Sequence, residues 1–142
     1  VREALEVYGR TLPPDDQYVA AAEYVLGEVL LNTDRLADAQ AVLTASMNRW
    51  RRSDAPAWRA ARSASALGEA LYREGRAQEA EKYLLLGFRD LNTENGADKA
   101  TRDRARERIR RFYADRGEHQ KMRELLLTTD PRSAVASDSR AN

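Results

Sequence analysis

Few residues of this 142-residue chain have the types and spacing that catalysis needs. The chain has no cysteine and one histidine, His119, which excludes disulfides, thiolate nucleophiles, cysteine-based metal sites and any mechanism that needs two histidines. Ser63 and Ser65 lack a histidine partner, and Gly27 and Gly68 are single glycines within predicted helices, which are unsuited to cradling a phosphate. We predict no enzymatic activity, no cofactor and no metal site.

Three other features can be interpreted either as structure or as a site. His119 follows a Gly-Glu turn and is predicted to be a surface residue rather than a proton shuttle or a ligand. Asp15 and Asp16 are predicted to cap a helix N-terminus, and contact with a cation is the alternative. Trp50 and Trp58 flank a short loop, where we expect them to close one helix pair onto the next; the alternative is an exposed anchor for a partner.

Arginines are concentrated in the segment 102–116, although the net charge of the whole chain is only +1. Residues 1–100 carry a formal charge of −3 and residues 101–142 one of +4. This asymmetry is compatible with a nucleic-acid surface. However, three acids interrupt the arginines, which fall on nearly all sides of a helix without an aromatic stacking platform. We therefore predict a solvated capping helix, with an acidic partner or a phosphate contact as the alternatives.

The elements that carry these residues are predicted from an internal repeat. Over residues 20–43, eight of 24 positions are identical to the residue 41 places further on, and both copies contain Leu-Gly-Glu-x-Leu followed by Ala-x-x-x-Leu. Because glycine inside a helix costs about 1 kcal/mol relative to alanine, Gly27 and Gly68 indicate closely packed helices. A third copy, displaced by 42 residues, has Arg110 at the glycine position and is predicted to be a cap.

With four prolines, seven glycines and 33% charged residues, the composition fits an all-α protein. The apolar spacing and the turn signals predict seven helices, at about 1–11, 16–32, 36–51, 57–73, 77–92, 99–115 and 118–128. We expect one helical repeat domain over residues 1–128, made of a truncated first repeat, two full repeats and an atypical capping repeat. Residues 129–142 lack periodicity and are predicted to be a disordered tail.

The sequence shows neither a membrane span nor an export signal. No window of about 18 consecutive apolar residues is present, and residues 1–10 lack the apolar core of a signal peptide. We therefore expect a cytoplasmic chain without membrane contact. Since the sequence begins inside a helical pattern and without methionine, we also expect it to be part of a larger protein.

The repeat resembles the tetratricopeptide repeat, in which an apolar residue, Leu-Gly and a large apolar residue precede a small residue and a large one. The matching positions here are Ala64, Leu67, Gly68, Leu71, Ala80 and Leu84, with a weaker version over residues 23–43. The period of 41 to 42 residues exceeds the usual length of about 34 and is similar to the kinesin-light-chain-like subgroup. The stretch 84–102 also looks like the last repeats at the C-termini of bacterial serine/threonine protein kinases.

This resemblance implies αα-hairpins stacked in a right-handed superhelix, with the first helix of each repeat lining a concave face. The groove positions of the family imply a lining of Tyr24, Glu28, Leu31, Asn32, Arg62, Ser65, Glu69, Tyr72, Arg73, Glu107 and Arg111. Tyrosine and arginine in one concavity suit an acidic or extended peptide, because arginine can donate two hydrogen bonds to a carboxylate. The alternative is that Leu31 and Tyr72 are packing residues and that the charges form a solvated face.

We therefore predict a protein–protein interaction module that performs no chemistry. It is expected to bind a peptide, a partner or a sister domain of a larger bacterial signalling protein. The first alternative is a structural or oligomerisation element that self-associates through Leu5 and Tyr8. The second is a nucleic-acid-binding surface on residues 102–116, for which the affinity would fall steeply with salt.

Overall fold

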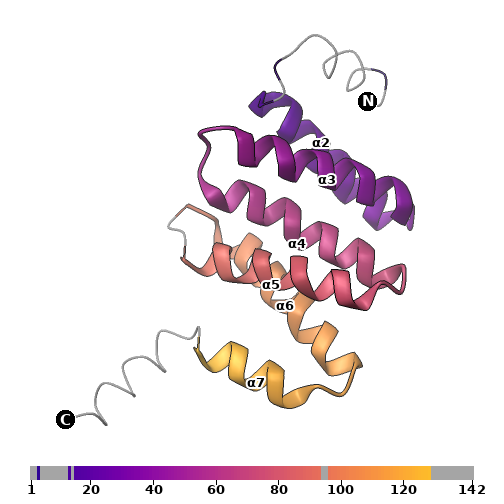
Figure 1. The fold of residues 1–142 in the computed structure, drawn as a ribbon, viewed down its shortest axis with the longest axis vertical. Coiled ribbons are helices and arrows are strands. Elements are labelled where there is room, and N and C mark those ends of the chain that lie inside the picture. Colours follow the sequence, from indigo (N-terminus) through magenta and orange to yellow (C-terminus); the bar gives the residue numbers. More distant parts are fainter. Residues whose placement is uncertain (1–2, 4–12, 14, 94–95, 129–142) are drawn as a thin grey trace, which may run out of the picture.

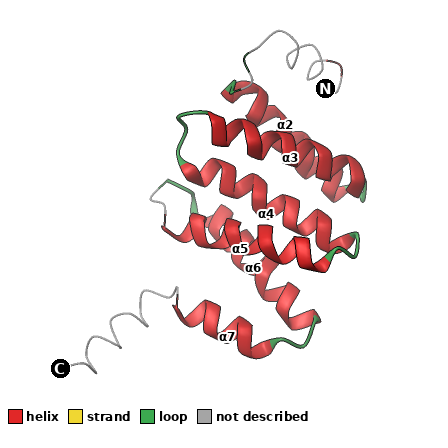
Figure 2. Ribbon diagram, viewed as in Figure 1, coloured by secondary structure: helices red, strands yellow, loops and turns green. Residues whose placement is uncertain are grey.

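A computed structural model describes residues 3, 13, 15–93 and 96–128. Between residues 15 and 128 the described chain forms six helices and no strand (Figure 1, Figure 2). These are α2 (Gln17–Asn32), α3 (Leu36–Arg52), α4 (Ala57–Arg73), α5 (Ala77–Thr93), α6 (Lys99–Asp115) and α7 (His119–Thr128). Their bounds agree with the predicted ranges to within one residue, so the all-α prediction is confirmed. Apart from residue 3, the helix predicted at 1–11 lies outside the described residues, as does the tail predicted at 129–142.

The helices form consecutive pairs, α2 with α3, α4 with α5 and α6 with α7, and the pairs follow one another along the long axis of the molecule (Figure 1). Aspartates cap two of the first helices. The carboxylate of Asp16 accepts hydrogen bonds from the amides of Tyr18 and Val19 at 2.9 and 3.0 Å, and that of Asp98 accepts one from the amide of Thr101 at 2.9 Å. These bonds satisfy amides that a helix leaves free at its first turn, so both residues set where their helices begin.

The turn inside each pair has the same backbone conformation at positions related by the repeat. Asp34, Gly75 and Gly117 have φ angles of 61°, 84° and 71°. This left-handed conformation is typical of the residue that ends a helix, and glycine adopts it without steric cost. In each turn the following amide donates to a carbonyl five residues earlier: Arg35 to Leu30 and Arg76 to Leu71 at 2.9 Å, and Glu118 to Tyr113 at 2.8 Å. The third repeat therefore keeps the turn although its sequence is less regular.

The two helical glycines lie where helices of one pair touch, as their repetition predicts. A Cβ atom at Gly27 would lie 2.4 Å from Cδ2 of Leu43, and one at Gly68 would lie 2.7 Å from Cγ of Leu84. Both leucines are fully buried in an apolar core that extends from α2 to α6. The third pair has the exposed Arg110 at this position and lacks the contact.

A buried polar contact joins the first pair to the second. The hydroxyl of Ser46 on α3 donates to the carbonyl of Ala20 at 2.7 Å, and its oxygen lies 3.0 Å from the hydroxyl oxygen of Ser63 on α4. Both serines are fully buried. Because a buried hydroxyl needs a hydrogen-bond partner, this contact fixes how α3 sits against α2 and α4, and Ser63 has a structural role.

Candidate functional site

The first helices of the three described pairs, α2, α4 and α6, border a hollow of about 460 Å³, here called the groove. Its lining consists of Leu31, Asn32, Glu69, Arg73, Arg104, Glu107, Arg108 and Arg111. A much smaller hollow of about 10 Å³, here called the inner void, adjoins the groove because Arg104 and Arg108 line both. The other walls of the inner void are Tyr24, Arg62, Ser65, Leu91 and Thr101.

The structure gathers the residues that the sequence assigns to a concave face. All of them except Glu28 and Tyr72 line the groove or the inner void. Those two contact α6 instead, Glu28 through Arg104 and Arg108, and Tyr72 through Asp115.

Two of these residues do not offer the exposed side chain that a groove lining requires. Leu31 and Ser65 are each only 2% exposed. Leu31 belongs to the apolar core, and the hydroxyl oxygen of Ser65 accepts a hydrogen bond from Nη1 of Arg108 at 3.3 Å. The expectation of an exposed side chain is therefore wrong for both residues. Leu31 packs inside the core, and Arg108 of α6 contacts Ser65 of α4. Tyr24 and Glu69 are also largely buried.

Ion pairs cross the groove and join helices that are far apart in the sequence. Glu28 on α2 lies 3.2 Å from Nη2 of Arg108 and 3.5 Å from Nη1 of Arg104, both on α6. Glu69 is at the equivalent position of α4, and it accepts a hydrogen bond from Nη2 of Arg111 at 3.0 Å. Both carboxylates are mostly buried, whereas Arg104 and Arg111 are about half exposed. Glu69 thus lies at the base of the groove, Glu28 lies behind the α6 arginines, and Arg104 and Arg111 reach the surface of the groove.

The base of the groove also contains an acceptor without a donor. Oε2 of Glu69 is buried and receives no hydrogen bond. Nearby, Nη1 of Arg73 donates to the carbonyl of Leu31 at 3.0 Å, and Nη2 pairs with Asp34. The half-exposed guanidinium groups of the groove can bind hydrogen-bond acceptors of an extended polypeptide, whereas the buried Glu69 oxygen is not accessible to one.

Tyr72 joins α4 to the end of α6. Its hydroxyl donates to Oδ2 of Asp115 at 2.6 Å, and its ring packs edge-on against Phe112 with 5.2 Å between the ring centres. The hydrogen bond to the Asp115 carboxylate raises the pKa of Tyr72 above its usual value. These contacts favour the interpretation of Tyr72 as a packing residue.

Aromatic rings and arginines alternate near the start of α4. Cζ of Arg62 lies 3.9 Å from the ring centre of Tyr24 and 5.3 Å from that of Trp58. Cζ of Arg59 lies 4.7 Å from the ring centre of Trp58 and 5.1 Å from that of Trp50. Trp50 is buried and Trp58 is half-buried, which fits their expected place between one helix pair and the next.

Arg104 and Arg108 are groove residues that the spacing of the sequence does not identify. Arg108 is only 7% exposed. It occupies the repeat position of Ala66, which is fully buried in α4. An arginine at a buried position of a repeat needs an acidic or polar partner inside the protein. The alignment of Arg108 with Ala66 in the internal repeat could therefore have identified Arg108 from the sequence.

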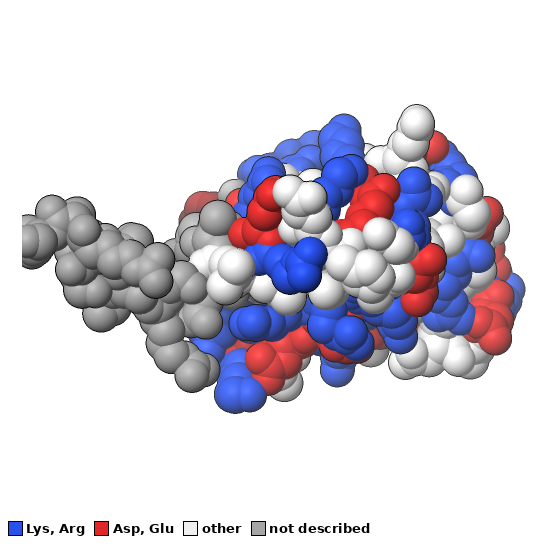
Figure 3. Space-filling model, turned by 90° about the horizontal axis from the view of Figure 1, so that it is seen from below, with Lys and Arg blue, Asp and Glu red and all other residues white. Residues whose placement is uncertain are grey.

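Most arginines of the segment 102–116 contact other residues of the chain. Arg102 donates to the carbonyl of Ala97, Arg104 and Arg108 pair with Glu28, Arg110 with Glu107, Arg111 with Glu69 and Arg116 with Glu118. On the face of the molecule seen in Figure 3, lysine and arginine side chains are interspersed with aspartate and glutamate side chains. The segment is therefore an ion-paired helix that borders the groove, which corrects the prediction of a merely solvated cap.

The residues considered for catalysis or metal binding stay separate from one another. His119 is exposed at the start of α7, and Asp16 caps α2. Among the residues that the structure describes, no group of three histidine, aspartate or glutamate side chains could hold a metal ion. Within the same residues, no helix has the length and apolar character needed to cross a membrane.

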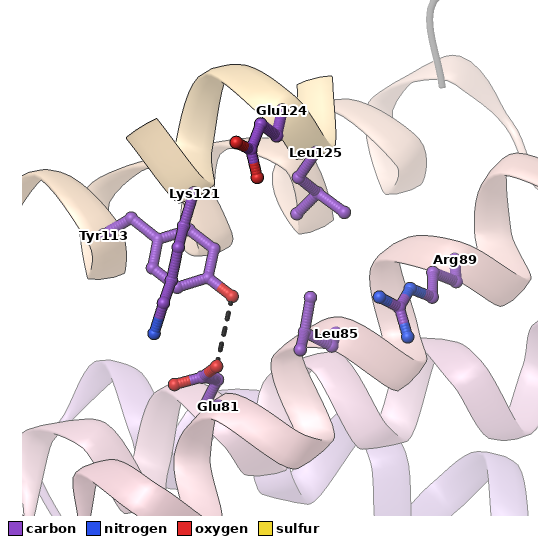
Figure 4. A pocket seen from close by; sticks show the side chains of 7 residues that line it. All are labelled: Glu81, Leu85, Arg89, Tyr113, Lys121, Glu124 and Leu125. Atoms are coloured by element: carbon purple, nitrogen blue, oxygen red, sulfur yellow. Dashed lines mark hydrogen bonds between the residues drawn. The ribbon is translucent and has the colours of Figure 1, made fainter. Parts of the chain in front are cut away.

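A further hollow of about 330 Å³ lies between α5, α6 and α7 (Figure 4). Leu85 and Leu125 point toward each other across it, and charged side chains surround them: Glu81, Arg89, Lys121 and Glu124. The hydroxyl of Tyr113 donates to Oε1 of Glu81 at 3.3 Å, and burial raises the pKa of Tyr113 to about 12. This hollow is distinct from the groove, because the two have no lining residue in common.

Comparison with known proteins gives one match, within the repeated part of the chain. Residues 18–87 match the family model of the tetratricopeptide repeat. The matched segment runs from α2 into α5 and contains most of the two repeats that the internal period predicts. No curated protein matches the chain.

Proposed function

We propose that this chain, which carries tetratricopeptide repeats at residues 18–87, binds an acidic, extended segment of a partner protein in its groove. Tetratricopeptide repeats are generally protein–protein interaction modules and do not catalyse reactions. The observation that carries the proposal is the arrangement of the groove. Half-exposed guanidinium groups of Arg104 and Arg111 stand above the buried and incompletely bonded carboxylate of Glu69.

The proposed contacts follow from the chemistry of these groups. Arg104 and Arg111 keep N–H groups that face the groove and can donate to a carboxylate of the partner. Because the buried acids already neutralise part of the arginine charge, we expect moderate affinity that decreases with salt.

The test is a selection from a random peptide library displayed on phage, with the full chain as bait. We expect enrichment of acidic sequences, and synthetic versions should bind in a fluorescence anisotropy titration. The double variant Arg104→Glu and Arg111→Glu is expected to weaken binding about tenfold or more, because two attractive contacts become repulsive. Circular dichroism establishes that the variant remains helical.

The matched control changes the net charge by the same amount outside the groove. Arg106 and Arg123 are exposed and do not line the groove, so Arg106→Glu with Arg123→Glu should leave the affinity nearly unchanged. Selection of sequences without acidic residues, or equal loss of binding in both double variants, would show that the groove assignment is wrong.

We also propose that residues 1–12 supply the second helix of a truncated first repeat, which packs on α2. Val25 and Val29 of α2 are 60% and 52% exposed, whereas Ala66 and Ala70, their equivalents in α4, are fully buried. α3, the second helix of the first pair, precedes α4 and packs against it. The same relation would place the segment before α2 over Val25 and Val29.

The exposed valines also favour the alternative function of self-association. α2 carries no basic residue, its acids Glu23 and Glu28 pair with Arg49 and with α6, and Tyr18 adds an exposed aromatic ring. An uncharged stripe of this kind could pair with a second copy. Light scattering over a range of protein concentrations separates the two possibilities, because residues 1–12 covering the stripe would leave the chain monomeric.

We further propose that the chain is a part of a larger bacterial regulatory protein, in the cytoplasm, where the groove or the α2 stripe contacts a sister domain. The support is the long repeat period of 41 to 42 residues, which is similar to the kinesin-light-chain-like subgroup and to the C-terminal repeats of bacterial serine/threonine protein kinases. Sequencing of the gene upstream of Val1 tests this proposal directly.

A further inference from the structure

Three guanidinium groups converge on the inner void between α2, α4 and α6. Arg62 comes from α4, and Arg104 and Arg108 come from α6. Glu28 is paired with Arg104 and Arg108, and within the described residues no acid pairs with Arg62. Three positive charges therefore line the void, and Glu28, the one acid paired with them, is not among the lining residues.

The charge of Arg62 is the least compensated of the three. Burial lowers the pKa of Arg62, and the neighbouring Arg59 acts in the same direction. The acids that oppose this effect, Glu28 and Asp98, act on Arg62 from a distance without contacting it. The ring of Tyr24 covers one face of the Arg62 guanidinium but leaves the edges of the group to donate hydrogen bonds.

One of these donors has no acceptor. Nε of Arg62 is buried and makes no hydrogen bond. A buried N–H group of a charged side chain is costly to leave unpaired, so its occurrence beside a void indicates a missing partner. That partner must accept hydrogen bonds, and the local excess of positive charge favours an anion over a neutral acceptor.

The size of the void limits the choice of anion. Its volume of about 10 Å³ is close to that of one water-sized sphere, so even a single-atom anion such as chloride enters only with a small outward shift of the walls, for which the half-exposed Arg104 side chain leaves room. Phosphate, sulfate and carboxylate groups contain several heavy atoms and need a larger shift. We propose that the inner void is a halide site, which chloride occupies between the guanidinium groups of Arg62, Arg104 and Arg108.

Such an ion would join three repeats at one point. Arg62 belongs to the second pair and Arg104 and Arg108 to the third, while Glu28 of the first pair already holds the two α6 arginines. Bound chloride thus relieves repulsion among the arginines and fixes the spacing of α2, α4 and α6. Because these helices form the walls of the groove, chloride stabilises the groove whether or not a peptide binds there.

The first experiment measures the thermal unfolding of the full chain while sodium chloride replaces sodium methanesulfonate at constant ionic strength. A ligand that binds only the folded state raises the melting temperature progressively as its concentration increases, and we expect this for chloride. Arg62→Met keeps much of the side-chain volume but removes the charge and the unpaired donor. We expect it to weaken chloride binding about tenfold or more, as loss of a hydrogen bond from a charged group predicts.

Arg59→Met is the matched control. Arg59 also stacks on Trp58 and also lacks an ion pair within the described residues, but it does not line the inner void. The control should keep the chloride dependence of the wild-type chain. Absence of a chloride-dependent rise in the melting temperature of the wild-type chain, or its equal loss in both variants, would overturn the proposal.

The second experiment does not depend on any variant. Crystals of the wild-type chain grown or soaked in sodium bromide should give an anomalous peak between Arg62, Arg104 and Arg108. A peak at this place supports the proposal. Bromide only at other positions, with ordinary water density in the void, would contradict it.

Discussion

Tyr113, on α6 of the third pair, contacts Phe112 on its own helix and Glu81 on α5 of the second pair. Its ring is buried beside Phe112, and its hydroxyl donates to Glu81 of α5. Burial and the nearby Glu81 carboxylate both disfavour the phenolate and raise the pKa of Tyr113 to about 12. The folded state therefore keeps a proton that the unfolded chain releases at a lower pH.

This raised pKa predicts a pH dependence of stability. Between about pH 10, the usual value for tyrosine, and pH 12, the folded state binds more protons than the unfolded state, so the free energy of unfolding falls as the pH rises. Tyr113→Phe should remove this part of the slope, measured by urea unfolding at several pH values. Tyr18→Phe, at an exposed position, is the control and should change nothing. An unchanged slope in Tyr113→Phe would contradict the prediction.

At the scale of the helices, the packing of each pair depends on a glycine of the first helix. The three atoms nearest to a Cβ at Gly27 all belong to the side chain of Leu43, whereas a Cβ at Gly68 would also lie 2.9 Å from the backbone nitrogen of Leu84. A side chain can move within its helix, but a backbone atom moves only with the whole helix. The second pair is therefore less able to accommodate an added methyl group.

Gly68→Ala is accordingly expected to lower the free energy of unfolding by about 1–3 kcal/mol, the usual effect of overpacking. This loss exceeds the gain of about 1 kcal/mol from helix propensity. Gly27→Ala should cost less, and Arg110→Ala, at the equivalent exposed position of α6, should change stability by less than about 0.5 kcal/mol. Urea unfolding of the three variants gives the order, and a stabilised Gly68→Ala would show that α4 and α5 are not in contact as described.

At the scale of the whole molecule, the ends of the repeat array differ. α2 presents the exposed side chains of Tyr18, Val25 and Val29, whereas α7 presents only Leu127 among the large exposed apolar residues of the described chain. A terminal repeat usually has a polar outer face. The polar end at α7 fits a cap, and the apolar end at α2 fits an interface with further polypeptide.

A comparison of Val25→Asp with Leu127→Asp tests this difference, since the two residues are 60% and 59% exposed. If residues 1–12 cover α2, Val25→Asp buries a charge and should lower the free energy of unfolding by about 1–3 kcal/mol. Leu127→Asp should have little effect. Equal stability of both variants, together with a change from dimer to monomer in Val25→Asp by light scattering, would favour self-association instead.

The sequence by itself determined the helices, the turns and the close contact within each full pair. These features depend on local spacing and on residue type. The apolar period determines the helices, Asp34, Gly75 and Gly117 determine the turns, and the helical glycines determine the close contacts with Leu43 and Leu84. Only the tertiary structure decided that Arg108 lies inside, bonded to Glu28 and Ser65, and that Leu31 is part of the core. The reason is that these contacts join helices up to 80 residues apart, and their formation depends on how successive pairs stack, which no local pattern specifies.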